Sequence, residues 1–344
     1  MVAGLLLPAC QVRGETNTSF DVDPGVNGGD WRALVAGAAA HSIIRFHPGN
    51  YTAGADGCNV TLRDGVQLVA TMPGEPVMVD CQGSGGRHFS VAEGASVVVD
   101  GLTFANGESH ENAGCVLVRA GGSLEIRNSR LVNCNADDCG GGVYIEEGGA
   151  FSAFNSTLEN CASNGHGGAI YGIASSIVLT GGTYSGNTAG ENGGLAYVDG
   201  SSLTVTQGAQ AFENDAERGG CIFAIRESVV DITHGVILRD NLATAHGGAI
   251  YAHTSCIVRM THQVQCIRNS ATTDCGCIQL YNDCELHASD NVTFANNTAG
   301  DDGGAMCSQA VDCVVTLQRG TAGLCCGWRL TMSHCIFCEP LQCF

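Results

Sequence analysis

The hexapeptide HGGAIY occurs at His166–Tyr171 and again at His246–Tyr251, either as a histidine site used twice or as part of a longer repeat. The second glycine of the motif has equivalents throughout the chain, at intervals of 26 to 28 residues. These anchor glycines are Gly114, Gly141, Gly168, Gly194, Gly220, Gly248, Gly276 and Gly304. Eight units in register indicate a structural repeat, which must be recognised before any local motif is interpreted.

Each unit contains short runs of alternating apolar residues, such as Ile250/Ala252 and Val258/Met260, and no helical periodicity. Three short strands for each 26 to 28 residues predict an all-β fold, a right-handed parallel β-helix of about ten coils. Coils stacked about 4.8 Å apart would form a rod of roughly 48 Å. We expect the anchor glycines to supply the backbone conformation of a tight corner.

A turn position precedes the anchors, by seven residues in most units, and asparagine occupies it in the later units. Equivalent residues of stacked coils lie above one another, so their amides can hydrogen-bond along the rod. The asparagines are Asn187, Asn214, Asn241, Asn269 and Asn297.

The GGAIY motif with the turns FANG, LENC and FANN resembles the GGAI and FxxN repeats of chlamydial polymorphic outer-membrane proteins, and similar β-helix proteins of algae and protists. The resemblance covers about residues 90–310. Upstream, WRALVAGAAAHSIIRFHPGNYT resembles the N-terminal cap of pectin-lyase-like folds, which implies a short capping helix near residues 30–40. We therefore expect a weakly ordered leader (1–29), a β-helix (30–320) and a Cys-rich tail (321–344). The tail is either a disulfide-bonded end cap or an artefact of the gene model.

Composition restricts the class of protein. A formal charge of −19 with only 15 basic residues excludes the basic footprint of a nucleic-acid binder. No apolar run reaches the roughly 18 residues of a spanning helix, so no transmembrane segment is expected. The 20 cysteines and six N-glycosylation sequons favour an extracellular or cell-surface location; the sequons begin at Asn17, Asn50, Asn59, Asn155, Asn291 and Asn296. The start, MVAGLLLPAC, is a poor signal peptide because it lacks a basic region.

Candidate catalytic and metal-binding residues are sparse. Asp274 and Asp302 stand one coil apart and could hold calcium, although solvated turn residues are the simpler interpretation. His166 and His246 lie three coils apart, roughly 14 Å, too far to share a zinc ion. Polygalacturonase and pectate-lyase signatures do not occur in the required order. We expect no catalytic residues and no cofactor, and keep a polysaccharide lyase or glycoside hydrolase as the alternative.

The cysteines leave two interpretations open. Cys134 and Cys161 are equivalent residues of neighbouring coils, and so are Cys256 and Cys284. Either pair could form a cross-coil disulfide, because adjacent coils place their Cα atoms about 5 Å apart, or the thiols could stay free and stacked. The motif Cys335-x-x-Cys338 is a weak zinc signal without a second half.

Aromatic residues recur three positions after the anchors, and alternation predicts that this row faces outward. Such a row can stack on sugar rings or bury a partner protein, or the rings can simply shield their own backbone. The row is Tyr144, Tyr171, Tyr197, Phe223 and Tyr251. We therefore expect a non-enzymatic adhesion-type rod whose partners are surface glycans or proteins.

Overall fold

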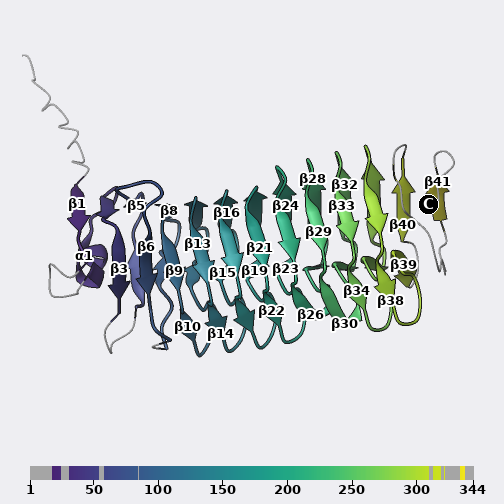
Figure 1. The fold of residues 1–344 in the computed structure, drawn as a ribbon, viewed down its shortest axis with the longest axis horizontal. Helices are drawn as coiled ribbons and strands as arrows, with labels where there is room; N and C mark the ends of the chain where they lie inside the picture. Colours follow the sequence, from purple (N-terminus) through teal and green to yellow (C-terminus); the bar gives the residue numbers. More distant parts are fainter. Residues whose placement is uncertain are drawn as a thin grey trace, which may run out of the picture.

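The structure, a computed structural model, is a parallel β-helix in which successive coils stack into a rod (Figure 1). It describes residues 18–24, 31–53, 58–83, 85–309, 313–318, 321 and 334–337. Every strand pairing in these ranges is parallel, as between Val143–Ile145 and Ile170–Gly172. Connections between parallel strands of one sheet are almost always right-handed in proteins, and the β-helix predicted from the sequence has this handedness. Among the described residues, no helix has the length and apolarity needed to cross a membrane.

The strands form four sheets, which we name A to D. Sheet A contains β1 (Ser19–Val22), β2 (Ile43–Phe46), β5 (Gln67–Ala70), β8 (Ser96–Asp100), β12 (Ser123–Arg127), β16 (Ala150–Phe154), β20 (Ser176–Thr180), β24 (Ser202–Thr206), β28 (Val229–Thr233), β32 (Ile257–Thr261), β36 (Glu285–Ser289), β40 (Val314–Leu317) and β41 (His334–Phe337). Sheet B contains β3 (Gly49–Thr52), β6 (Val77–Asp80), β9 (Thr103–Ala105), β13 (Arg130–Val132), β17 (Thr157–Glu159), β21 (Thr183–Ser185), β25 (Gln210–Phe212), β29 (Ile237–Arg239), β33 (Gln265–Ile267) and β37 (Thr293–Ala295).

The two remaining sheets meet at the glycine corner. Sheet D contains β10 (Glu108–Ser109), β14 (Asn135–Ala136), β18 (Ala162–Ser163), β22 (Thr188–Ala189), β26 (Asp215–Arg218), β30 (Leu242–His246), β34 (Ser270–Ala271) and β38 (Thr298–Ala299). Sheet C contains β4 (Val60–Leu62), β7 (Phe89–Val91), β11 (Val116–Val118), β15 (Val143–Ile145), β19 (Ile170–Ile173), β23 (Ala196–Asp199), β27 (Ile222–Ile225), β31 (Ile250–His253), β35 (Ile278–Tyr281) and β39 (Met306–Gln309).

One coil thus runs through sheets C, A, B and D in turn, as β15, β16, β17 and β18 do. The sequence predicts three strands in each coil, and the structure adds the short strands of sheet D. These were missed because most of them are only two residues long, too short for an alternating pattern. Ten strands each in sheets B and C agree with the prediction of about ten coils.

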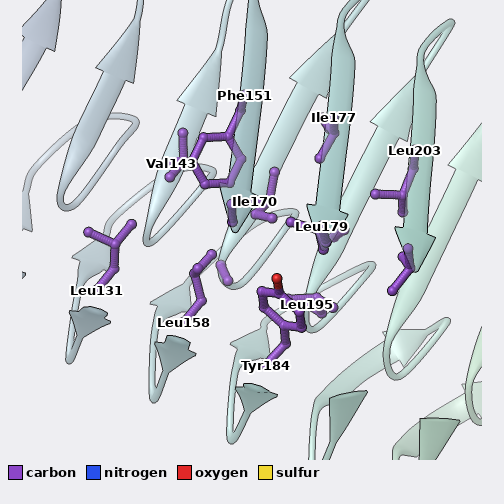
Figure 2. Close-up of a cluster of buried hydrophobic side chains, with 14 of the residues drawn as sticks. Leu131, Val143, Phe151, Leu158, Ile170, Ile177, Leu179, Tyr184, Leu195 and Leu203 are labelled. Carbon is purple, nitrogen blue, oxygen red and sulfur yellow. The ribbon is translucent and has the colours of Figure 1, made fainter. Parts of the chain in front are cut away.

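The core fills the inside of the coils, where equivalent apolar residues stack from one coil to the next (Figure 2). Phe151, Ile177 and Leu203 form one such row across β16, β20 and β24, and each is at most 1% exposed. Burying a side chain of this size contributes about 1.5–3 kcal/mol. The residues that alternate with these core residues along each strand face outward. The candidate aromatic row lies on this outer face.

The corner glycines have a different role from the one expected. A Cβ at Gly141 would lie 2.2 Å from the Ala162 oxygen and 2.3 Å from the Gly168 oxygen, so the anchor is needed for close approach of the coils. The left-handed backbone conformation belongs to the residue before it, as at Gly140 with φ 66°. The expectation that the anchors supply that conformation is corrected: their Cβ-sized space is already filled by backbone.

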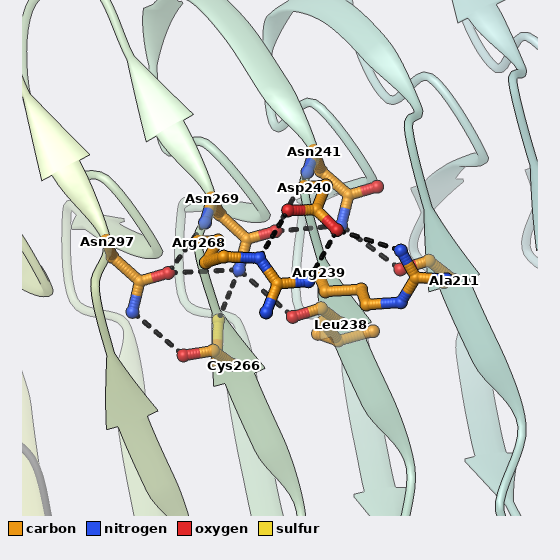
Figure 3. A network of polar contacts seen from close by, with 9 residues as sticks. All are labelled: Ala211, Leu238, Arg239, Asp240, Asn241, Cys266, Arg268, Asn269 and Asn297. Atoms are coloured by element: carbon orange, nitrogen blue, oxygen red, sulfur yellow. Dashed lines mark hydrogen bonds and ion pairs between the residues drawn. The ribbon is translucent and has the colours of Figure 1, made fainter.

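The asparagine turns between sheets B and D form a buried ladder (Figure 3). The Nδ2 of Asn241 donates to the Oδ1 of Asn269 at 2.9 Å and to the Ala211 carbonyl at 3.2 Å. The backbone N–H of Asn241 also donates to the Asn269 Oδ1, at 3.0 Å. Asn187, Asn214 and Asn297 continue the same pattern. The ladder satisfies polar groups that would otherwise be buried without partners.

Both ends of the rod contain strands outside the predicted β-helix boundaries. Strand β1 lies in the segment expected to be a leader, yet it pairs in register with β2. Strand β41 lies in the Cys-rich tail and pairs with β40. The capping helix is α1 (Trp31–Gly37), whose Trp31 and Val35 are buried. The ring centroids of Trp31 and Phe46 are 6.5 Å apart, so the helix packs on the first coils.

Candidate functional site

The aromatic row forms a continuous stack on sheet C, which we call the aromatic ladder: Tyr144, Tyr171, Tyr197, Phe223 and Tyr251. Neighbouring ring centroids are 4.9 to 5.2 Å apart, and neighbouring ring planes differ by at most 8°. The parallel register causes this spacing, because it places each ring directly over the equivalent ring of the next coil. Tyr197, Phe223 and Tyr251 form a cluster separate from the main core, on the outer face.

The stack determines which parts of the rings remain available. Tyr197, Phe223 and Tyr251 are only 7%, 5% and 6% exposed; Tyr197 and Phe223 have a ladder ring on both faces, and Tyr251 stacks on Phe223 and pairs with Gln279 in the next coil. A sugar ring cannot enter between rings about 5 Å apart, since two stacked contacts need roughly 7 Å at a carbon–carbon separation of 3.5 Å. Stacking between the rings is thus unavailable, and contact with a ligand is limited to ring edges and hydroxyl groups.

The tyrosine hydroxyls lie at those edges. Burial raises the pKa of Tyr251 to about 12, and it also raises the pKa of Tyr171 and of Tyr197. No hydrogen bond from the described residues offsets these shifts. The hydroxyls therefore stay protonated at neutral pH, and each can donate one hydrogen bond and accept others. A partner lying along the rod would meet one such group in most coils of the ladder.

A polar row runs beside the aromatic ladder, two residues before each anchor, and includes His166, Asn192, Arg218, His246, Asp274 and Asp302. The His166 ring stacks on Tyr197, with centroids 4.6 Å apart and planes 15° apart. Asn192 Nδ2 donates to His166 Nδ1 at 3.2 Å. Burial lowers the pKa of His166, although the Glu191 carboxylate opposes the shift. His166 is thus part of the wall of the aromatic ladder.

Arg218, His246 and Asp274 occupy the polar row in three successive coils. His246 Nδ1 lies 3.3 Å from Asp274 Oδ2, and Gln309 Nε2 donates to the same oxygen at 2.7 Å. Desolvation raises the pKa of Tyr251, and the positive charge of Arg218 opposes this shift. A basic residue, an imidazole and a carboxylate therefore converge beside the ladder.

In the sequence, His166 and His246 are considered as a possible zinc pair and Asp274 and Asp302 as a possible calcium pair, and their position beside the aromatic ladder is not predicted. The constant five-residue offset from His166 to Tyr171 and from His246 to Tyr251 is the signal that could have revealed it. Asp274, one of the two calcium candidates, already has partners on its carboxylate. Calcium binding at Asp274 and Asp302 stays a prediction.

The disulfides differ from the cross-coil pairs considered in the sequence. Cys134 is bonded to Cys115, with Cα atoms 5.3 Å apart, and Cys161 is a buried free thiol. Cys256 and Cys284 are also free, and the Cys256 N–H donates to the Cys284 Sγ at 3.2 Å. Equivalent side chains of adjacent coils project in parallel, which favours stacking over a bond. The other described disulfides are Cys58–Cys81, Cys266–Cys277 and Cys275–Cys307.

The sequon asparagines within the described residues are all exposed: Asn50, Asn59, Asn155, Asn291 and Asn296. Asn155 Nδ2 donates to Asn128 Oδ1 at 3.0 Å, so a glycan there would have to break this contact. Asn17 lies outside the described residues, as does Cys338, and the Cys335 side chain is likewise not described. Glycosylation stays a prediction.

The comparison with family models agrees with the repeat. The Chlamydia polymorphic membrane protein repeat matches residues 291–308, which contain the FANN turn and the anchor Gly304. No curated protein matches the chain. Among solved structures, the chain is similar to a PL6 family polysaccharide lyase from Pseudopedobacter saltans, at 13% identity and a TM-score of 0.33. That alignment covers 93% of this chain and 92% of the lyase. The chain is a parallel β-helix protein that carries a repeat of the chlamydial type.

Proposed function

We propose that this protein is a non-enzymatic rod of the extracellular space or cell surface, which binds a glycan or protein partner along the outer face of sheet C. The observation that carries the proposal is the aromatic ladder, which lies outside the core and leaves its tyrosine hydroxyls without partners in the described residues. If the aromatic ladder only shielded the backbone of sheet C, phenylalanine would suffice, yet four of its five rings carry a hydroxyl.

The repeat supports a multivalent mode of binding. Each coil of the ladder offers a similar ring edge, four of the five rings also offer a hydroxyl, and the next ring lies about 5 Å further along the rod. Individual hydrogen bonds at such a surface contribute little, about 0.5–1.5 kcal/mol each. Several bonds formed by one extended partner reinforce each other because the rigid rod holds the groups at fixed positions. The charge of −19 disfavours strongly anionic partners away from Arg218.

The test uses substitutions that remove the hydroxyls and keep the stack. Phe223 shows that the ladder accepts phenylalanine, so Tyr171→Phe/Tyr197→Phe/Tyr251→Phe should fold normally. We expect this variant to lose at least tenfold in affinity for the glycans or surface proteins that the wild type retains on an array. Tyr184→Phe is the matched control, because Tyr184 lies in the core and donates to the Gly181 carbonyl. Equal binding by the triple variant and the wild type would refute the proposal.

A second function, polysaccharide lyase or glycoside hydrolase, is favoured by one observation. Arg218, His246 and Asp274 bring a cation, an imidazole and a carboxylate together in adjacent coils beside Tyr251. Groups of these types can remove and donate protons during cleavage of a glycosidic bond. A screen of neutral and acidic polysaccharides with and without calcium distinguishes the two functions. Turnover that is abolished by Arg218→Ala and His246→Ala would replace the adhesion proposal.

A further inference from the structure

A buried cluster of two cysteines and one histidine lies near the N-terminal end of the rod, away from the aromatic ladder. Cys58 precedes β4, Cys81 follows β6, and His88 precedes β7. One ligand atom from each residue lies within 4.8 Å of the other two. The three residues are 5%, 0% and 1% exposed. In this structure the two sulfurs are joined as a disulfide.

The orientation of His88 is that of a metal ligand. The backbone carbonyl of Val79 lies 3.0 Å from Nε2, so this nitrogen carries the proton and donates it. The other nitrogen, Nδ1, is buried and makes no hydrogen bond in the described residues. Because Nε2 carries the proton of the neutral ring, Nδ1 keeps its lone pair. Metal-binding histidines typically donate their other N–H to a carbonyl or carboxylate in this way.

The ring is closely packed on the side of Nδ1, where a Cβ on Gly107 would lie 2.9 Å from Nδ1, 2.4 Å from the Gly114 carbonyl oxygen and 2.8 Å from the Cys115 Sγ. Cys58 also lines an open depression at the surface beside Arg32 and Ala33 of α1.

We propose that Cys58, Cys81 and His88 form a zinc site when the disulfide is reduced. Zinc–sulfur bonds of about 2.3 Å and zinc–nitrogen bonds of about 2.0–2.1 Å place tetrahedral ligand atoms roughly 3.5–3.8 Å apart. On reduction the two sulfurs must move apart to this separation, and the His88 nitrogen, now within 4.8 Å of both, must move closer. Three protein ligands leave the fourth zinc position for water.

The disulfide and the metal site are alternative states of the same sulfurs. A phosphine such as TCEP cleaves the sulfur–sulfur bond and is oxidised to its oxide, while water supplies the oxygen atom and the two thiol protons. Zinc binding then displaces those two protons and holds both sulfurs as thiolates. The cluster thus links the N-terminal coils by a covalent bond under oxidising conditions and by zinc under reducing conditions.

The test uses the full chain, reduced with TCEP, freed of excess reductant without air, and checked for β structure by circular dichroism. We expect the reduced wild type to bind zinc and, with cobalt, to show a thiolate charge-transfer absorption. Cys58→Ser/Cys81→Ser should bind one equivalent fewer, which separates this site from other cysteines of the chain. Cys275→Ser/Cys307→Ser, which removes the disulfide between two later coils, is the matched control and should keep that equivalent.

His88→Gln separates the ligand role from the fold. Glutamine retains hydrogen-bonding capacity but lacks the imidazole nitrogen, so zinc affinity should fall at least tenfold while β structure persists. Equal zinc stoichiometry in the wild type and in Cys58→Ser/Cys81→Ser would overturn the proposal. A reduced wild type that stays folded without binding zinc, or one that unfolds whether or not zinc is present, would overturn it as well.

Discussion

Two ladders run along this rod, and they differ in whether their polar groups have hydrogen-bond partners among the described residues. In the asparagine ladder four of the amides donate both to the asparagine of the next coil and to a backbone carbonyl, and they are at most 1% exposed: Asn187, Asn214, Asn241 and Asn269. In the aromatic ladder the ring faces are satisfied by stacking, while the hydroxyls at the edges are not hydrogen-bonded within the described residues. The first ladder therefore accounts for stability alone, whereas the second has polar groups at its ring edges that our proposal assigns to a partner.

The largest effect is expected from breaking the asparagine ladder in its middle. Asn241→Ala removes the acceptor of the Asn214 N–H and Nδ2 groups and the donor to the Ala211 carbonyl, all of them buried. Each buried group left unpaired costs about 1–3 kcal/mol, so we expect a loss of about 3–5 kcal/mol in the free energy of unfolding. Urea unfolding followed by circular dichroism measures it.

Asn164→Ala is the control for that substitution, because Asn164 is an exposed asparagine of the same rod. We expect it to change the unfolding free energy by less than about 0.5 kcal/mol. If both variants lose the same stability, the ladder does not account for the stability of the rod, and the contrast between the two ladders fails.

A smaller loss is expected from interrupting the aromatic ladder. Tyr197→Ala removes stacking on Tyr171 and Phe223, but this face lies outside the main core. We expect a loss of about 2 kcal/mol, below the 3–5 kcal/mol typical of a large aromatic in a core. Tyr197→Phe should cost under about 0.5 kcal/mol because the hydroxyl has no partner to lose. A Tyr197→Phe loss as large as that of Tyr197→Ala would show that the hydroxyl has a structural role.

The smallest effect is expected from the titration of His166, which stacks on the aromatic ladder. His166 has a pKa lowered by burial, so the folded state disfavours its protonated form. Its contribution to stability is complete above the unfolded pKa of about 6.5 and declines as the pH falls below it. Unfolding free energies measured from pH 7.5 to 5 should fall less in His166→Gln than in the wild type. Identical pH profiles would contradict the assignment of His166 to the wall of the ladder.

Much of the fold could be predicted because its cause is repeated in every coil. The spacing of Gly141, Gly168 and their equivalents sets the coil length, and alternation at Ile250 and Ala252 sets which residues face inward. The aromatic row was assigned outward by the same alternation. Most strands of sheet D escaped prediction because two residues have no periodicity. The role of Gly140 was assigned to its neighbour because sequence does not distinguish a φ requirement from close approach.

The sequence by itself therefore determined the coil, its length and the inward and outward faces, since these depend on residues that recur at a constant interval. Only the tertiary structure decided what depends on contacts between coils at specific places. It paired Cys134 with Cys115, and it set Arg218, His246 and Asp274 side by side in adjacent coils. It also brought Cys58, Cys81 and His88 together from three segments. These contacts are singular within the rod, and a periodic pattern carries no information about features that occur once.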